Sequence, residues 1–195
     1  MMPIDVTAAR DATPGCRDLI HLNNAGAALP THNVLTTQIE YLQLEAQIGG
    51  YEASTHEQAR IDEIRPTIAR LVGADPSGDE VALTLNNTVA FDLFLYSWAT
   101  SSTHAPDPSD RILTTETEYG ANFVAYLHLA KRFGVEVEVV PSNDHGEIDL
   151  DALEATIRRT DVGPVKLIAL NLIPTNGGLI NPAAGVGSIA REHGI

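Results

Sequence analysis

The hydrophobic and polar positions of this chain follow two different periods. Apolar residues recur every three or four positions at Ile61, Ile64, Ile68 and Leu71, which predicts a helix. The run VEVEVV at 135–140 instead alternates every second residue, which is typical of a strand. From residue 80 onward the two patterns follow one another in turn.

These patterns predict a series of elements. Before residue 80, one helix is expected at about 32–47, and a second follows a capping box of Ser54 and Glu57, with a kink or restart at Pro66. After it, the chain predicts strands and helices in alternation. The strands are expected at 80–85, 111–114, 135–140 and 165–171, and the helices at 88–100, 121–133, 149–159 and 182–193.

Strands that alternate with helices form right-handed βαβ units. The sequence therefore predicts an α/β fold with a mostly parallel sheet and helices on both faces. Ligands of such sheets bind at the carboxyl ends of the strands, so the segments that follow the strands are the candidates for function.

Composition narrows the class of protein. With 195 residues, 44% of them hydrophobic and 19% charged, the chain is long and apolar enough for a globular core. Its formal net charge of −14 disfavours nucleic acid and acidic membranes as partners. Residues 1–18 lack the apolar core of a secretory signal, and Cys16 is alone, so a cytoplasmic protein without disulfides is expected. The seven histidines show no ligand-type pairing, so no metal site is predicted.

The first candidate site is LNNTVAF, residues 85–91, between a predicted strand and a predicted helix. The free N–H groups and the dipole of a helix N-terminus suit a phosphate. Asn86 and Asn87 tolerate left-handed turn conformations, which would explain why no glycine is needed. Thr88 could cap the helix and offer its hydroxyl to a phosphate oxygen. The alternative is a helix cap without a ligand.

Two further junctions lie at predicted strand ends. In TTETEYGANF, Tyr119 could lay its ring over a flat ligand, and Asn122 could cap the next helix or reach that ligand. In LNLIPTNGGLINP, Asn176 is a polar residue in the loop after a buried strand. Packing and a simple turn are the alternatives for each alone. Together the three junctions indicate a phosphorylated aromatic cofactor.

The order of these motifs resembles the class V aminotransferase and cysteine desulfurase-like family of pyridoxal 5'-phosphate (PLP) enzymes, fold type I, over roughly residues 19–195. The segment HLNNAGAALP is similar to one that lies near the substrate carboxylate, which implies that role for Asn24, Ala25 and Gly26. The resemblance implies an N-terminal arm and substrate-side segment at 1–30, followed at 31–195 by the first part of the PLP-binding large domain.

The same resemblance assigns cofactor contacts. LNNTVAF takes the phosphate-loop position, which implies that Asn87 and Thr88, with Asn86 beside them, hold the phosphate. EYGAN is similar to the motif Glu-His-x-x-Asn, so Tyr119 would stack on the pyridine ring. Tyrosine in place of histidine favours the epimerase-like and C–S lyase-like branches over typical cysteine desulfurases. PTNGGLINP is similar to Ser-Asn-x-x-Gly-x-x-Asn-Pro, so Asn176 would touch the phenolic oxygen.

Such enzymes act on a small amino-acid substrate through an external aldimine and loss of the Cα proton. The resemblance leaves open C–S cleavage, transamination and epimerisation, and it implies a homodimer. The Schiff-base lysine that this chemistry requires is not expected among these residues. Lys131 is predicted near a helix end and Lys166 at the amino end of a strand, so the large domain is expected to be cut before that lysine.

Two other functions stay open. The chain could be a folded but non-catalytic fragment or interaction module of this fold. It could also bind a nucleotide, because GVGSIA at 185–190 fits Gly-x-Gly-x-x-Ala. The dinucleotide motif must form the turn between a strand and a helix, whereas Pro182 is expected to have started the helix already, so this reading is disfavoured.

Overall fold

The computed structural model describes residues 4–24, 27–175 and 177–195. The chain divides into two compact units, Met1–Leu83 and Thr84–Ile195. The boundary expected near residue 30 stays a prediction.

The first unit is helical over its described residues. Its elements are α1 (Val6–Asp11), a 3-10 helix (Pro14–Arg17), α2 (His32–Ile48), α3 (Gly50–His56), α4 (Gln58–Asp62) and α5 (Ile64–Val72). The predicted capping box is wrong, because Ser54 lies inside α3 and the helix breaks at Glu57. The restart at Pro66 is confirmed, since α5 begins two residues before it. Among the described residues of this unit, the buried hydrophobic ones are Ala53 and Ala69.

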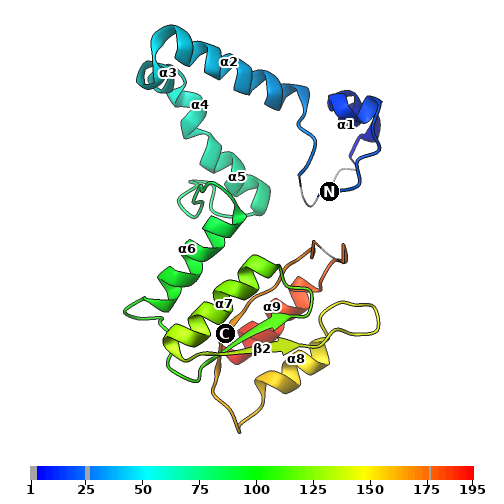
Figure 1. The fold of residues 1–195 in the computed structure, drawn as a ribbon, viewed down its shortest axis with the longest axis vertical. Coiled ribbons are helices and arrows are strands. Elements are labelled where there is room, and N and C mark those ends of the chain that lie inside the picture. The colour runs from blue at the N-terminus through cyan, green and yellow to red at the C-terminus, as the bar shows by residue number, and fades with distance from the viewer. Residues whose placement is uncertain (1–3, 25–26, 176) are drawn as a thin grey trace. The chain divides into compact units, whose positions relative to one another are not determined.

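The second unit carries the sheet (Figure 1). Its strands are β1 (Arg111–Thr115), β2 (Glu136–Val140) and β3 (Val165–Ile168), all parallel, in the order β2-β1-β3. Its helices are α6 (Asn87–Ala99), α7 (Gly120–Phe133), α8 (Leu150–Ile157) and α9 (Ala183–His193). The predicted α/β fold with a parallel sheet is confirmed.

Each face of the sheet packs against its own helices. Successive side chains of a strand point to opposite faces, so Ile112 joins the core that α6 and α7 cover, and Leu113 joins the core that α8 and α9 cover. Figure 1 shows the sheet between α7 and α9. The central strand β1 is buried along its whole length, as a strand covered on both faces should be. The predicted helices on both faces are therefore confirmed.

One predicted strand is wrong. Residues 80–85 form no strand, and Leu83 and Leu85 are exposed. The alternation of apolar residues is real, but a strand exists only where its N–H and C=O groups meet a partner strand. Among the described residues this segment has none.

Candidate functional site

Helix α6 begins with an extended cap. Asn86 has φ −167° and ψ 174°, and its side-chain oxygen accepts the N–H of Val89 at 3.0 Å. Thr88 already lies inside the first turn, so the prediction that it caps the helix is wrong. The left-handed turn expected at Asn86 and Asn87 is wrong as well, since neither has a positive φ. The junction needs no glycine because an extended N-cap suits any residue.

This cap leaves donors open at the start of α6. The N–H of Val89 bonds to the Asn86 side chain and that of Ala90 to the Asn86 carbonyl. Among the described residues, the N–H groups of Asn87 and Thr88 have no acceptor. Thr88 is half-buried and Asn87 is exposed. Two free N–H groups and a hydroxyl thus gather at the positive end of a 13-residue helix, where an anion is favoured.

Helices α6 and α7 run in the same direction, so their N-termini lie at one end of the unit (Figure 1). Phe91, in the second turn of α6, meets Tyr126, in the middle of α7, edge-on, with ring centroids 5.7 Å apart. Near their ends, Tyr96 and Thr100 line a surface hollow together with Phe133. The α6 N-terminus therefore lies on the side of the sheet where β1 ends and α7 begins.

Glu118, in the loop between β1 and α7, is the centre of this edge. Its carboxylate accepts hydrogen bonds from five donors that come from β1, the loop itself, α7 and the segment after β3. The donors are the Thr114 hydroxyl (2.9 Å), the Tyr119 N–H (2.7 Å), the Asn122 amide (3.2 Å), the Tyr126 hydroxyl (2.8 Å) and the Asn171 amide. One acceptor thus joins two strand ends and the start of a helix.

The two oxygens of this carboxylate have different partners. Oε2 accepts from Thr114 and Tyr126, which are buried in the scaffold. Oε1 accepts from Tyr119, Asn122 and Asn171, which lie at the carboxyl edge. Burial of the Tyr126 phenol, together with the negative charge of Glu118, raises the pKa of Tyr126 well above its usual range. The phenol is therefore neutral and stays a donor throughout the physiological range.

Asn122 brings an unused acceptor to the edge. Its residue is only 5% exposed, and its Nδ2 donates to Glu118, so Oδ1 is fixed as the acceptor end of the amide. No group among the described residues donates to that oxygen. A buried polar atom without a partner costs free energy, and such atoms mark places where a ligand or another group completes the structure. The expectation that Asn122 caps α7 is wrong, because Tyr119 holds the N-cap position and no side chain caps it.

Tyr119 stands at this edge as predicted from its position after β1. It is 43% exposed, and its ring has no aromatic partner among the described residues. Its backbone is fixed by the bond to Glu118, whereas its ring is left accessible. Whether the ring stacks on a cofactor stays a prediction.

Sequence reasoning missed three residues of the site. The motif EYGAN assigns no role to Glu118, and the apolar pattern predicts Asn171 as the last residue of a strand that in the structure ends at Ile168. Asn181 is buried, donates to the Asn171 carbonyl at 2.8 Å and accepts the Ile148 N–H at 3.0 Å, which holds the loop after β3 in place. A polar residue that closes the apolar run LIAL was the available signal for Asn171.

The remaining predicted site residues are only partly described. Asn24 lies in the first unit, where its amide donates to the His21 carbonyl at 3.5 Å. Ala25, Gly26 and Asn176 lie outside the described residues, so their assignments stay predictions.

Neither lysine lies at the carboxyl edge. Lys131 is exposed in the last turn of α7, the end opposite to Tyr119. Lys166 is the second residue of β3 and is also exposed, close to the amino end of that strand. The expectation that neither lysine forms a Schiff base stays a prediction.

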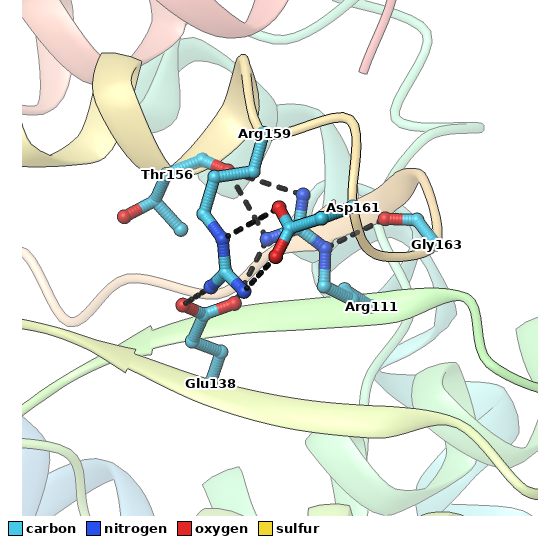
Figure 2. A network of polar contacts seen from close by, with 6 residues as sticks. All are labelled: Arg111, Glu138, Thr156, Arg159, Asp161 and Gly163. Carbon is cyan, nitrogen blue, oxygen red and sulfur yellow. Dashed lines mark hydrogen bonds and ion pairs between the residues drawn. The ribbon is translucent and has the colours of Figure 1, made fainter.

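The amino end of the sheet carries a second polar network, drawn in Figure 2. Arg111, 1% exposed, donates to the Gly163 carbonyl at 2.7 Å, to the Thr156 carbonyl at 3.1 Å and to Glu138 at 2.8 Å. Arg159 lies between Glu138 and Asp161 and bonds both. Ion pairing with Arg159 lowers the pKa of the Asp161 carboxyl. The charged groups of this network bond one another or backbone carbonyls, so we regard the network as structural.

One glycine of GVGSIA, Gly185, serves packing. Gly185 and Gly187 lie inside α9, not at a strand-to-helix turn. A Cβ on Gly185 would come within 2.7 Å of the Leu150 side chain, so this glycine allows α8 and α9 to approach closely. The structure therefore gives the nucleotide reading no phosphate turn at this motif.

Among the described residues, no helix is long and apolar enough to span a bilayer. The same residues hold no cluster of three side chains that could ligate a metal ion.

Comparisons with known proteins all give the same kind of protein. The family model described as Aminotransferase class-V matches residues 20–195. A probable cysteine desulfurase of Halobacterium salinarum is 28% identical over 202 residues, which cover 98% of this chain and 47% of that protein.

Solved structures show the same fold. The cysteine desulfurase CsdA from Escherichia coli superposes with a TM-score of 0.82 at 22% identity, over 100% of this chain and 48% of that one. C-DES, solved with glycine covalently linked to its PLP cofactor, gives a TM-score of 0.79 at 21% identity, over 98% of this chain and 46% of that one. The chain thus spans about half the length of the proteins it matches.

Proposed function

Since this chain belongs to the aminotransferase class-V family, we propose that it forms the PLP-binding part of an enzyme that acts on an amino-acid substrate. The observation that carries the proposal is the open N-terminus of α6, where Asn87 and Thr88 offer two free N–H groups and a hydroxyl. A phosphate monoester anion is the ligand that such a donor set suits best.

The residues at the carboxyl edge fit the rest of this cofactor. Tyr119 presents an accessible ring next to α7, which suits a flat aromatic ligand. Asn171 supplies an amide at the end of β3, and Asn122 holds a buried acceptor that lacks a partner. We keep the contact with the phenolic oxygen that was predicted for Asn176. We add Asn171 as a second amide for the same ring, because Asn171 is bonded into the edge through Glu118.

When bound, PLP supplies an electron sink that stabilises negative charge at the substrate Cα. In this proposal the chain's own residues bind and orient. Thr88 and the α6 N–H groups would hold the phosphate, Tyr119 would cover one face of the ring, and Asn176 and Asn171 would fix its rotation. Asn24, Ala25 and Gly26 would contact the substrate carboxylate.

Cysteine desulfurase-like C–S cleavage is the reaction that we favour, with a cysteine-type substrate, because the similar proteins are cysteine desulfurases. Transamination and epimerisation are the alternatives for the same site. We further propose that the protein is a homodimer, which sedimentation velocity would test. No lysine at the carboxyl edge is available for covalent attachment among the residues described.

The cofactor proposal is tested by titrating PLP into the natural polypeptide that contains this chain, following absorbance. Thr88→Val should weaken binding by about tenfold or more, because a hydrogen bond to a charged group contributes about 1.5–3 kcal/mol. The matched control is Thr100→Val at the other end of α6, where the hydroxyl bonds only the Tyr96 carbonyl. Absence of PLP binding by the unmodified protein would refute the proposal.

The alternative function is a non-catalytic module of this fold. A protein of that kind would bind PLP without a covalent bond, or not at all. Borohydride reduction followed by mass spectrometry separates the two functions, since only a covalently attached cofactor adds its mass to a lysine.

A further inference from the structure

The two carboxylate oxygens of Glu118 accept hydrogen bonds from different kinds of partner. Oε2 bonds scaffold groups, the hydroxyls of Thr114 and Tyr126. Oε1 bonds the backbone of Tyr119 and the amides of Asn122 and Asn171. A carboxylate has two oxygens and about four lone-pair positions, so five donors saturate it. Glu118 therefore has no capacity left to act on a ligand itself.

A carboxylate whose lone pairs are all used can still determine which atoms of the neighbouring side chains face a ligand. An amide side chain has a donor end and an acceptor end that differ little in shape, so packing alone selects between its two orientations weakly. An ionised carboxylate accepts and never donates, which forces the NH₂ end of each bonded amide toward it. In Asn122 this leaves Oδ1 as the free acceptor, and this is the atom that lacks a partner in a side chain 95% removed from solvent.

The same reasoning applies to Asn171. One hydrogen of its Nδ2 is held by Glu118, which fixes the plane of the amide and the direction of the second hydrogen. Its backbone is held independently by Asn181, so the side chain has a fixed origin and a fixed orientation. Tyr119 is fixed through its N–H, which leaves the ring free but locates the point from which it extends.

We propose that Glu118 is the positioning residue of the site, which sets the polarity of the Asn122 and Asn171 amides and the anchor point of Tyr119 without contacting the ligand. This inference rests on the proposed PLP function. It assigns to Oε1 a functional role and to Oε2 a structural one.

The two roles make different predictions for substitutions. Glu118→Gln keeps the size of the side chain but removes its charge and replaces one acceptor oxygen with an NH₂ donor. Because the Thr114 and Tyr126 hydroxyls can donate or accept, the glutamine can turn either end toward the Asn122 and Asn171 amides, so it no longer dictates which end of each amide faces it. The amides of Asn122 and Asn171 then lose their defined orientation. Tyr126→Phe and Thr114→Val remove donors to Oε2 only and leave the Oε1 partners in place.

The experiment measures the Kd for PLP and the pH titration of the bound cofactor's absorbance in the natural polypeptide containing this chain. The thermal midpoint is measured for each variant alongside. For Glu118→Gln we expect PLP affinity to fall at least tenfold and the pH titration to shift. For Tyr126→Phe and Thr114→Val we expect a lower thermal midpoint with the Kd changed less than twofold. Glu138→Gln, at the amino end of the sheet, is the matched charge-removing control and should behave like the last two.

The outcomes are separable. If the unmodified protein does not bind PLP, the proposed function fails. If it binds PLP and Glu118→Gln binds equally well, the positioning role of Glu118 is overturned and the cofactor proposal stands. If Glu118→Gln does not fold, the Oε2 variants decide, since a PLP affinity that falls together with their thermal stability would overturn the division between the two oxygens.

Discussion

Replacement of Arg111 by methionine tests the structural reading of the network in Figure 2. Methionine keeps much of the apolar bulk of the arginine stem but removes every donor. The Gly163 and Thr156 carbonyls would lose their partner, and Glu138 would keep only Arg159. Removing one member of a buried ion pair costs about 3–5 kcal/mol, because the remaining groups stay desolvated and unpaired.

The expected cost lies near the lower end of that range. The Glu138 side chain is 29% exposed, so water can partly replace the lost charge. We therefore expect Arg111→Met to lower the free energy of unfolding by about 3 kcal/mol, a large share of the 5–15 kcal/mol typical of a domain. Arg159 bonds the same glutamate at the same 2.8 Å, but its side chain is 41% exposed. Arg159→Met should cost only about 0.2–1 kcal/mol.

Urea unfolding measures both values. The single tryptophan, Trp98, packs against the core between α6, α7 and the sheet, so its fluorescence reports the second unit. Double-mutant cycles with Glu138→Gln should give a larger coupling for Arg111 than for Arg159, about 1–3 kcal/mol against less than about 1. An Arg111→Met variant as stable as Arg159→Met would refute the view that burial, rather than contact distance, determines the strength of these pairs.

Four further predictions concern single side chains. Gly163→Ala should unfold the second unit at lower urea, because the new Cβ would lie 2.0 Å from a backbone oxygen. Asn86→Ala should cost about 1 kcal/mol in the same assay through loss of the α6 cap. Hydrogen bonding from Ser142 lowers the pKa of Glu116, so the stabilisation of the fold by this carboxylate should be present above about pH 4.3 and lost as the pH falls. Glu116→Gln should remove this pH dependence when unfolding is followed during acid titration. The raised pKa of Tyr126 should make stability fall as pH rises above about 10, and Tyr126→Phe should abolish that fall in alkaline melting curves.

The helices and strands that the sequence predicted correctly are those determined by residues within or next to the element itself. The alternation at 135–140 and the glycine at Gly134, which adopts φ 76° at the end of α7, lie within a few residues of the structure they determine. Residues 80–85 show the limit of this reasoning. Their alternation was read correctly, but pairing depends on a distant segment that no local pattern identifies.

The candidate site shows the same limit in its chemistry. Thr88 and Tyr119 were located because strand-to-helix junctions are visible in the sequence. Glu118 and Asn171 are 53 residues apart and acquire their roles only when β1 and β3 lie side by side. A glutamate in a loop is normally a solvated charge, so only the fold could show that this one gathers five donors.

The central strand β1 is tied down at both ends, by Arg111 at its start and through Thr114 to Glu118 at its finish. A slip of one residue would exchange the faces of Ile112 and Leu113 and break both attachments at once. States in which this strand is only partly opened are therefore expected to have a high free energy. Its backbone amides should exchange with deuterated solvent only when the entire second unit unfolds, as the slowest group in the chain.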